Sequence, residues 1–223
     1  MIVAKFPSRS RPQRFKECLS QWVANSHDKT NVHYLFSFDL DDLSMKGIEP
    51  FIESLGIPHT IKWGSSVSKI HAVNRDINEL ELEWSHIIVL SDDMWPVVNE
   101  WDRRILSAYA EAIPEGDAML WCFDGKQGDI CTLPIMDRPY YDRTKYIYHP
   151  SYLSVWCDNE QTEVAELMGR LYYVETPLAH HRHPSNVHNV KPDALYRKNE
   201  TDVIWKKDHQ NYKNRKAMNF PNV

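Results

Sequence analysis

Four apolar residues at positions 87–90 (Ile-Ile-Val-Leu) are followed at once by Ser91 and by two adjacent carboxylates, Asp92 and Asp93. An unbroken apolar run of this length is typical of a strand buried on both faces, as at the centre of a parallel sheet. The run ends abruptly, and Pro96 cannot continue a hydrogen-bonded ladder. The sequence therefore predicts a central strand with two acids at its carboxyl end, where open α/β sheets bind ligands. A solvated turn or a helix N-cap is the alternative role for these acids, because aspartate is common in both.

The first 112 residues alternate between strand-like and helix-like segments. Apolar strands are predicted at residues 2–6, 32–38, 59–63 and 87–90. Helices are predicted from about residue 12, over residues 42–55, after residue 66 as a long helix carrying Ile70, Val73, Ile77 and Leu80, and over residues 100–112. This alternation predicts an α/β fold with a mostly parallel central sheet, right-handed crossovers and flanking helices.

The rest of the chain is less regular. A strand is predicted at residues 118–123, whereas residues 125–150 are rich in Gly, Pro, Asp and Tyr and show no clear period. A short helix at about residues 162–168 and a strand at residues 171–174 follow, and the chain is polar from residue 180 onward. We therefore expect one domain with a regular half (1–112), an irregular half (113–190) and a polar C-terminal extension (191–223).

Composition fits an ordinary soluble domain. The chain has 223 residues, 42% hydrophobic and 26% charged, with a net charge of −5, which does not suit a general polyanion binder. No apolar run approaches the roughly 18 residues of a membrane span, and the N-terminus is unlike a secretory signal, so a cytoplasmic location is expected. The four cysteines include no Cys-x-x-Cys pair and are expected to be free thiols.

Acidic side chains follow two of the predicted parallel strands. Asp39 follows the second strand, and Asp92 and Asp93 follow the fourth. Because the carboxyl ends of parallel strands share one edge of the sheet, we expect these three carboxylates to lie on the same rim.

Four short motifs, taken in order, resemble family 2 glycosyltransferases of the GT-A fold. They are residues 7–9 (Pro-Ser-Arg), the aspartate-rich end of the second strand, residues 68–74 (Ser-Lys-Ile-His-Ala-Val-Asn) and residues 91–93 (Ser-Asp-Asp). The resemblance covers residues 1 to about 110 and continues more loosely to His183. Small soluble GT-A proteins of bacteriophages, which modify DNA bases, are similar in type. The family usually has an Asp-x-Asp metal motif; here Ser91 stands at its first position, which leaves Asp93 as the expected direct ligand.

The resemblance implies a metal-dependent enzyme that moves a hexosyl or pentosyl group from a nucleotide-diphosphate sugar to an acceptor hydroxyl, with inversion. Residues 1–112 would bind the donor, and residues 113–190 would shape the acceptor and catalytic side. Mn²⁺ or Mg²⁺ would neutralise the charge that develops on the leaving diphosphate. The acceptor would be a glycan, a small molecule or a modified DNA base. Basic clusters near both ends could bind DNA phosphates, although the net charge of −5 argues mildly against duplex DNA as the acceptor.

The resemblance also implies roles for individual residues at the donor. Asp93 would bind the metal, Asp92 would lie near the ribose or the metal's water shell, and Asp39 would hydrogen-bond the nucleobase or its ribose. The other residues expected at the donor site are Pro7, Ser8, Arg9, Lys69, Asn74, Arg197 and Lys198. A solvated lysine and a helix-surface asparagine explain Lys69 and Asn74 equally well.

Three histidines, His180, His181 and His183, are crowded ahead of Pro184. On an extended segment alternate residues share a face, so His181 and His183 would point one way and His180 the other. A late histidine serves as a metal ligand in several GT-A enzymes, and by that resemblance His181 is the first candidate and His183 the second. An ordinary core or surface histidine is the alternative for each.

The acceptor hydroxyl needs a base at hydrogen-bond distance. In inverting members of the family an acid after the acceptor loop takes the proton, and Asp158 is the first candidate here. The family often has a Glu-Asp pair at this point, whereas this chain has Asp158-Asn159-Glu160, so Glu160 is the second candidate. The alternative is that Asp158 caps the helix that follows.

Two other functions stay open. A nucleotidyltransferase on a similar α/β sheet typically has a Gly-rich phosphate loop after the first strand, and residues 7–12 contain no glycine. A non-catalytic sugar- or nucleic-acid-binding protein of the same fold is the other alternative, and Ser91 in place of an aspartate favours it.

Overall fold

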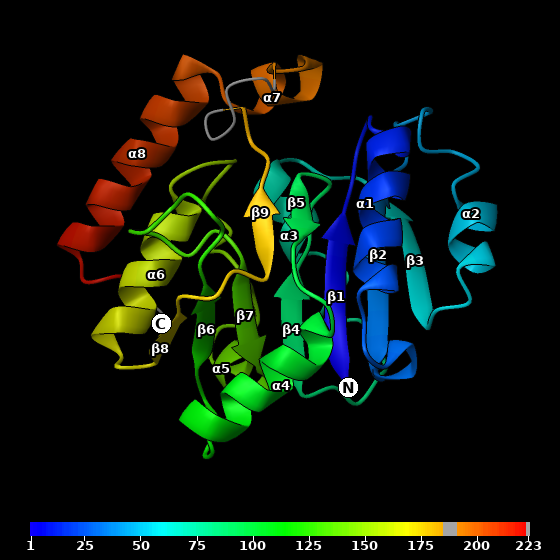
Figure 1. The fold of residues 1–223 in the computed structure, drawn as a ribbon. Coiled ribbons are helices and arrows are strands. Elements are labelled where there is room, and N and C mark those ends of the chain that lie inside the picture. Colours follow the sequence, from blue (N-terminus) through cyan, green and yellow to red (C-terminus); the bar gives the residue numbers. More distant parts are fainter. Residues whose placement is uncertain (185–190, 222–223) are drawn as a thin grey trace.

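The computed structural model describes residues 1–184 and 191–221. Within these residues the centre of the fold is a seven-stranded sheet with the strand order β3-β2-β1-β4-β7-β6-β8 (Figure 1). Of these seven strands, only β7 runs antiparallel to its neighbours. The predicted α/β fold with a mostly parallel sheet is therefore confirmed. The strands are β1 (Ile2–Pro7), β2 (Val32–Asp39), β3 (His59–Gly64), β4 (His86–Val89), β6 (Met119–Cys122), β7 (Pro134–Asp137) and β8 (Leu171–Val174).

Helices cover both faces of this sheet, because alternate strand residues are apolar on both sides. Along β1, Ile2, Ala4 and Phe6 pack in one hydrophobic core, whereas Val3 packs in a second core on the opposite face. The first core is completed by helices α1 (Pro12–Ala24), α2 (Glu49–Ser54) and α4 (Trp101–Ala112). The second is completed by α3 (Lys69–Asn74), α5 (Arg138–Asp142) and α6 (Cys157–Leu167).

Two tryptophans fix α1 and α4 against the strand that follows the paired aspartates. The rings of Trp22 and Trp101 meet edge to face, with centroids 5.1 Å apart. The Trp22 indole donates to the carbonyl of Met94 (2.8 Å), and the Trp101 indole donates to the carbonyl of Trp22 (2.8 Å). Both buried N–H groups are thus satisfied, and the backbone next to Asp93 is held in place.

Two helices are shorter than predicted. Of residues 42–55, only α2 is helical, because Asp42 accepts hydrogen bonds from the amides of Ser10 (2.6 Å) and Ser44 (3.1 Å) and fixes a turn. The long helix predicted after residue 66 is limited to α3, because the chain turns at Asp76, whose φ is 72°. Ile77 still packs in the second core, so its apolar position reflects burial rather than a continuing helix.

Residues 125–150 contain β7 and α5, which the sequence pattern did not predict. Strand β7 is only four residues long and is defined by its partners β4 and β6, which pair with it on either side. Helix α6 begins at Cys157, earlier than the predicted start near residue 162.

The two remaining strands and the last two helices lie at the carboxyl edge of the sheet and beside α6 (Figure 1). Strands β5 (Met94–Pro96) and β9 (Ala179–His181) form a separate antiparallel pair. Helices α7 (Ala194–Asn199) and α8 (Asp202–Ala217) end the chain, and a short 3-10 helix, η1 (Lys29–Asn31), precedes β2. Across the described ranges, no helix combines the length and apolar character needed to cross a membrane.

Candidate functional site

A pocket of about 360 Å³ opens at the carboxyl edge of β1, β2 and β4, and we call it the edge pocket. Such a volume suits a small-molecule ligand. Its walls come from these strand ends, from α3, from the residues before and at the start of α6, from β9, from α7 and from the start of α8. Ten of the residues singled out from the sequence line it: Pro7, Ser8, Arg9, Asp39, Lys69, Asp92, Asp93, Asp158, His181 and Lys198.

Asn74 and Arg197, expected at the donor, do not line the edge pocket. The Asn74 side chain donates to the carbonyl of Tyr148 (2.6 Å) and accepts from the amides of Ile147 (3.0 Å) and Tyr148 (3.2 Å). Arg197 donates to the carbonyl of Pro192 (2.8 Å). Asn74 therefore ties α3 to the loop before α6, and we assign it no ligand contact.

Glu160 and His183 also lie outside the pocket wall. Glu160 is buried and accepts from Arg215 (2.7 Å, Nη2 to Oε1) and from the hydroxyl of Tyr152 (2.7 Å). His183 Nε2 lies 3.0 Å from Oε1 of Glu200, and its ring centroid lies 5.4 Å from that of His181. Both residues thus have structural partners of their own.

Asp39 is the last residue of β2 and lines the edge pocket. Its Oδ2 accepts from Arg9 (2.7 Å), whose guanidinium also forms a two-bond pair with Asp41 (2.6 and 2.8 Å). The other oxygen, Oδ1, is buried and accepts no hydrogen bond from any described residue, although Arg75 lies 3.8 Å away. A buried acceptor without a donor is costly, so this atom is suited to receive an N–H or O–H group from a ligand.

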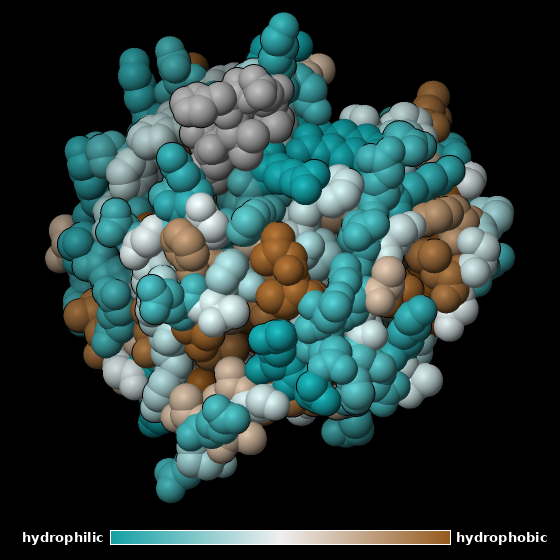
Figure 2. Space-filling model, in the orientation of Figure 1, coloured by the Kyte–Doolittle hydropathy of each residue, from teal (hydrophilic) through white to brown (hydrophobic). Residues whose placement is uncertain are grey.

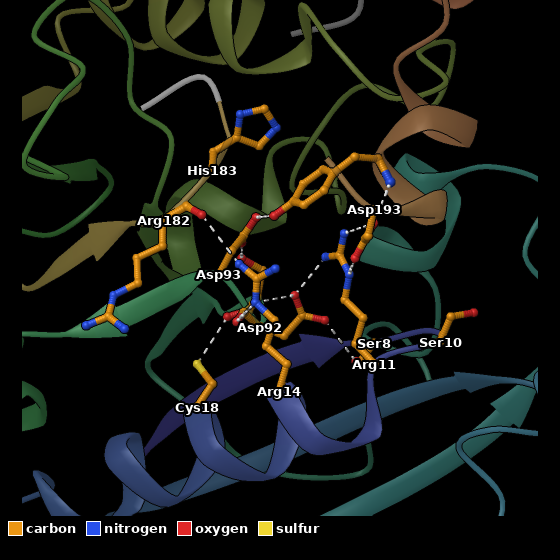
Figure 3. A network of polar contacts seen from close by, with 12 residues as sticks. Ser8, Ser10, Arg11, Arg14, Cys18, Asp92, Asp93, Arg182, His183 and Asp193 are labelled. Atoms are coloured by element: carbon orange, nitrogen blue, oxygen red, sulfur yellow. Dashed lines mark hydrogen bonds and ion pairs between the residues drawn. The ribbon is translucent and has the colours of Figure 1, made fainter. Parts of the chain in front are cut away.

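Asp92 lies between two arginines of α1 and its preceding turn (Figure 3). Arg11 donates to Asp92 Oδ1 (2.9 Å) and forms a two-bond pair with Asp193 (2.7 and 2.8 Å), while Arg14 donates to the Asp92 carbonyl (3.0 Å). Burial and the neighbouring Asp93 raise the pKa of Asp92, and Arg11 opposes this. Figure 2 shows strongly hydrophilic residues gathered between α7 and the start of α1, where this network lies.

Asp93 faces the helix α7 and the strand β9. The hydroxyl of Tyr196 donates to its Oδ2 (2.6 Å), the hydroxyl of Ser91 donates to its Oδ1, and His181 Nε2 lies 3.6 Å from Oδ2. Against the effect of burial, His181 and the two hydroxyls hold the pKa of Asp93 well below its usual range. Asp93 is therefore an anion inside the pocket.

His181 lies between two carboxylates. Its Nε2 faces Asp93, and its Nδ1 lies 3.6 Å from Oδ2 of Asp124. Burial would lower the pKa of His181, but Asp124 and Asp93 raise it to about 9. Asp124 is itself fixed by the hydroxyl of Thr132 (2.6 Å). The sequence reasoning missed Asp124, although it directly follows a predicted strand, just as Asp39 does.

The side chains of Asp93, His181 and Asp124 decide whether this part of the pocket can hold a divalent cation. No group of three or more His, Cys, Asp or Glu side chains within residues 1–184 and 191–221 is arranged as a metal site. Asp93 and His181 do converge, and a carboxylate with an imidazole is a donor pair that Mn²⁺ accepts. Asp124 behind His181 resembles the carboxylate that commonly orients a metal-binding histidine. The pair fits a cation that takes its remaining ligands from phosphate oxygens and water.

Asp158 lies in the first turn of α6 and lines the edge pocket. Burial raises the pKa of Asp158, and the nearby Lys69 opposes the rise. Its side chain accepts from the amide of Asn159 (3.0 Å) rather than from an amide further along the helix, so it is not an ordinary N-cap. Ser154, on the same wall, has a buried hydroxyl that bonds to no described residue.

No protein-family model and no curated protein matches the chain, but solved structures do. A mannosyltransferase from Pyrobaculum calidifontis, PcManGT in complex with GDP-Man and Mn²⁺, superposes with a TM-score of 0.60 at 10% identity over 79% of this chain and 54% of that one. TarS residues 1–349 from S. aureus, in complex with UDP-GlcNAc, gives 0.61 at 12% identity over 92% and 66%. The chain thus spans only about half the length of the mannosyltransferase.

A third structure is shorter. The 4-diphosphocytidyl-2C-methyl-D-erythritol synthase from Anaerococcus prevotii DSM 20548 has a TM-score of 0.54 at 11% identity, over 94% of this chain and 95% of that one. These likenesses define the class of fold: the chain has the GT-A fold, shared by glycosyltransferases and a nucleotidyltransferase. The GT-A fold that we expected from the sequence motifs is therefore confirmed.

Proposed function

We propose that this protein is a glycosyltransferase that binds a nucleotide-diphosphate sugar in the edge pocket and transfers the sugar to an acceptor hydroxyl. The observation that carries the proposal is the convergence of Asp39, Asp93, His181 and Asp158 on one pocket at the carboxyl edge of the sheet. Two proteins of the same fold were solved with GDP-Man and Mn²⁺ and with UDP-GlcNAc, which supports a donor of this class.

The nucleoside would lie at the β2 end of the pocket. The buried Oδ1 of Asp39 would accept an N–H of the base or a ribose hydroxyl, which satisfies an atom that otherwise has no hydrogen bond from the described residues. Arg9 holds the carboxylate in position through the other oxygen (2.7 Å). Asp92, fixed by Arg11, would lie near the ribose.

The diphosphate would lie between this end and β9. Asp93 and His181 would hold Mn²⁺ or Mg²⁺, which when bound would supply positive charge against the leaving diphosphate. Lys69 and Lys198 line the same pocket and would add positive charge near the phosphates. Asp124 would keep the His181 ring oriented.

Asp158 would act as the base. It would remove the acceptor hydroxyl proton while the acceptor oxygen forms a bond to the anomeric carbon of a hexosyl or pentosyl donor. The bond from that carbon to the β-phosphate oxygen breaks, and the nucleoside diphosphate leaves with the electron pair. This single displacement inverts the anomeric centre. A carboxyl with a pKa raised by burial is better matched to proton removal near neutral pH than an exposed aspartate.

The acceptor would be a hydroxyl of a glycan, a small molecule or a modified DNA base. The chain has a net charge of −5, which favours a small or glycan acceptor over duplex DNA. A cytoplasmic enzyme, including one encoded by a bacteriophage, is consistent with this substrate class.

Nucleotidyl transfer is the second candidate. It is favoured by the near-complete overlap with the diphosphocytidyl-methylerythritol synthase, 94% of this chain and 95% of that one. It is disfavoured by the absence of any glycine at positions 7–12, where a phosphate loop would follow β1.

Product analysis separates the candidates. The protein is incubated with a panel of UDP-, GDP-, CDP- and dTDP-sugars and Mn²⁺, and separately with nucleoside triphosphates and sugar phosphates. Slow release of a nucleoside diphosphate from one nucleotide sugar is the expected result. Release of pyrophosphate from a triphosphate would favour nucleotidyl transfer, and turnover of neither set would favour a non-catalytic binding protein.

A further inference from the structure

Helix α8 is attached to the rest of the protein in an unusual way. Its buried residues in the described structure are Asp208 and Arg215, both charged, and its aromatic residues Trp205, His209 and Tyr212 lie against the ring of Trp156. Surface helices are normally held by a hydrophobic face. Here two buried ionic side chains add directional contacts to this aromatic face.

Asp208 is fully buried against the loop that precedes α6. Its carboxylate accepts from three consecutive backbone amides: Leu153 (3.1 Å to Oδ1 and 3.2 Å to Oδ2), Ser154 (2.8 Å) and Val155 (3.0 Å). Successive amides that point at one anion form a concave anion-binding turn. Because hydrogen bonds to an ionised carboxylate are among the strongest in proteins, the backbone at residues 153–155 is clamped to α8.

The clamped loop is part of the edge pocket wall. Leu153, Ser154, Cys157 and Asp158 all line the pocket, and α8 itself contributes Ile204. The carbonyl of Leu153 also accepts from the amide of Ile70 at the start of α3, next to Lys69. The position of this loop therefore sets where the wall that carries Asp158 stands relative to the donor side.

Between the clamped amides and Asp158 stands a residue in an unfavourable backbone conformation. Trp156 has φ 65° and ψ −8°, in the left-handed region that bulky side chains rarely adopt. From α8, the ring of His209 stacks on the Trp156 indole at 4.2 Å, and Tyr212 lies at 5.3 Å. Such strain persists only where the surroundings hold it, and here α8 holds both the backbone before Trp156 and its ring.

We propose that Asp208 is a positioning residue, which fixes the loop of residues 153–156 and thereby places Asp158 against the acceptor hydroxyl. This inference rests on the proposed glycosyl transfer. It gives α8 an indirect role in catalysis, although Asp208 does not line the edge pocket.

The test is the Asp208→Asn variant, which keeps the shape of the side chain and removes its charge. In this variant kcat for donor turnover should fall by about tenfold or more, because small displacements of a reacting group cost large factors in rate. The KM for the nucleotide sugar should change by less than about threefold, because Asp208 itself does not line the edge pocket. The backbone amides of residues 153–155 should exchange with deuterium faster than in the wild type.

Arg215→Met is the matched control, because it removes the other buried charge of α8 at the Glu160 contact and not at the loop. It should lower the melting temperature at least as much as Asp208→Asn while kcat per folded molecule stays near the wild-type value. Equal kcat losses in the two variants would mean that α8 matters only for folding, and would overturn the inference.

If Asp208→Asn does not fold, hydrogen–deuterium exchange of the wild-type protein still tests the inference. Amides 153–155 should be protected as strongly as those of β4; exchange as fast as in an exposed loop would overturn it. If the wild type turns over nucleotide sugars and Asp208→Asn is fully active, the inference is overturned and the proposed function stands. A wild type that turns over no nucleotide sugar would overturn the proposed function, and the catalytic part of the inference with it.

Discussion

The Oδ2 atom of Asp93 lies 3.6 Å from Nε2 of His181, although the two residues belong to distant parts of the chain. The antiparallel pair β5–β9 brings them together, with Met94 opposite His181 and the amide of Arg182 donating to the Asp93 carbonyl (2.7 Å). The two proposed donors for a divalent cation are thus brought together by backbone pairing.

Removing either donor should therefore weaken cation-assisted nucleotide binding. In Asp93→Ala and in His181→Ala, the gain in affinity for a nucleoside diphosphate on adding Mn²⁺ should fall by about tenfold or more, as seen when groups around a metal are lost. Titration calorimetry with and without Mn²⁺ measures this. The control is His180→Ala, an exposed neighbour outside the edge pocket. An unchanged Mn²⁺ effect in both donor variants would contradict the assignment.

Asp39 should matter for the nucleoside and not for the cation. In Asp39→Ala, nucleoside diphosphate binding should weaken by about 1.5–3 kcal/mol, the value of a hydrogen bond to a charged group, with or without Mn²⁺. Asp41→Ala is the matched control, because Asp41 shares the Arg9 contact but is 74% exposed. Equal losses in the two variants would mean that Arg9, rather than the buried Oδ1 of Asp39, is responsible.

Asp158→Asn should abolish transfer and spare binding. Loss of a general base costs about 10²–10⁴ in rate, whereas affinity for the nucleoside diphosphate should stay within about twofold of the wild type. Only the ionised carboxylate can take the proton, so activity should fall as pH falls through the Asp158 pKa. Burial raises that pKa, so the acid limb of the kcat/KM profile should lie above the ordinary aspartate value of about 4. Normal turnover in Asp158→Asn would remove it from this role.

Glu160 should contribute to stability rather than to chemistry. It forms a buried ion pair with Arg215 (2.7 Å), and removing one partner of such a pair leaves an uncompensated charge. We expect Glu160→Gln and Arg215→Met each to lower the free energy of unfolding by about 3–5 kcal/mol, measured by urea denaturation. A Glu160→Gln variant of normal stability that has lost turnover would instead support the catalytic role considered from the sequence.

Acid should destabilise the protein partly through His86. Burial, assisted by the N-terminal amine, lowers the pKa of His86 from 6.5 to about 4. Between these two values the unfolded chain binds a proton that the folded one does not, so stability falls as pH is lowered from 6.5 to about 4. In His86→Phe this part of the pH dependence should vanish. Denaturation curves of the two proteins across this range test it, and parallel pH dependence would count against the assignment.

The meeting of Asp39 and Asp93 at one pocket was largely predictable from the sequence, because it follows from topology. Once residues 1–112 were interpreted as alternating strands and helices, Asp39 and Asp93 had to share the carboxyl edge of a parallel sheet. Both residues line one pocket in the structure. The lengths of α2 and α3 were not predictable, because Asp42 and Asp76 turn the chain through side-chain hydrogen bonds and a positive φ.

The contacts that α7 and α8 make with the site were not predictable, because they join residues with no shared local pattern. Tyr196 reaches Asp93 from α7, and Asp208 reaches residues 153–155 from α8, two helices in a segment that composition alone describes only as polar. Glu160 is the second candidate base from the sequence because it stands two residues after Asp158. A helix turns residues two apart to different faces, and Glu160 points toward Arg215. Asp124 was the exception, since its place after a predicted strand could have identified it.

The central claim is that the edge pocket receives a nucleoside diphosphate together with a divalent cation. A thermal-shift series with UDP, GDP, CDP and dTDP, each with and without Mn²⁺, tests it most directly, because a ligand that binds the folded state raises the melting temperature. We predict that one nucleoside diphosphate with Mn²⁺ raises the melting temperature more than either component alone, and that Asp93→Ala removes the difference. No shift with any nucleoside diphosphate at millimolar concentration would contradict the account.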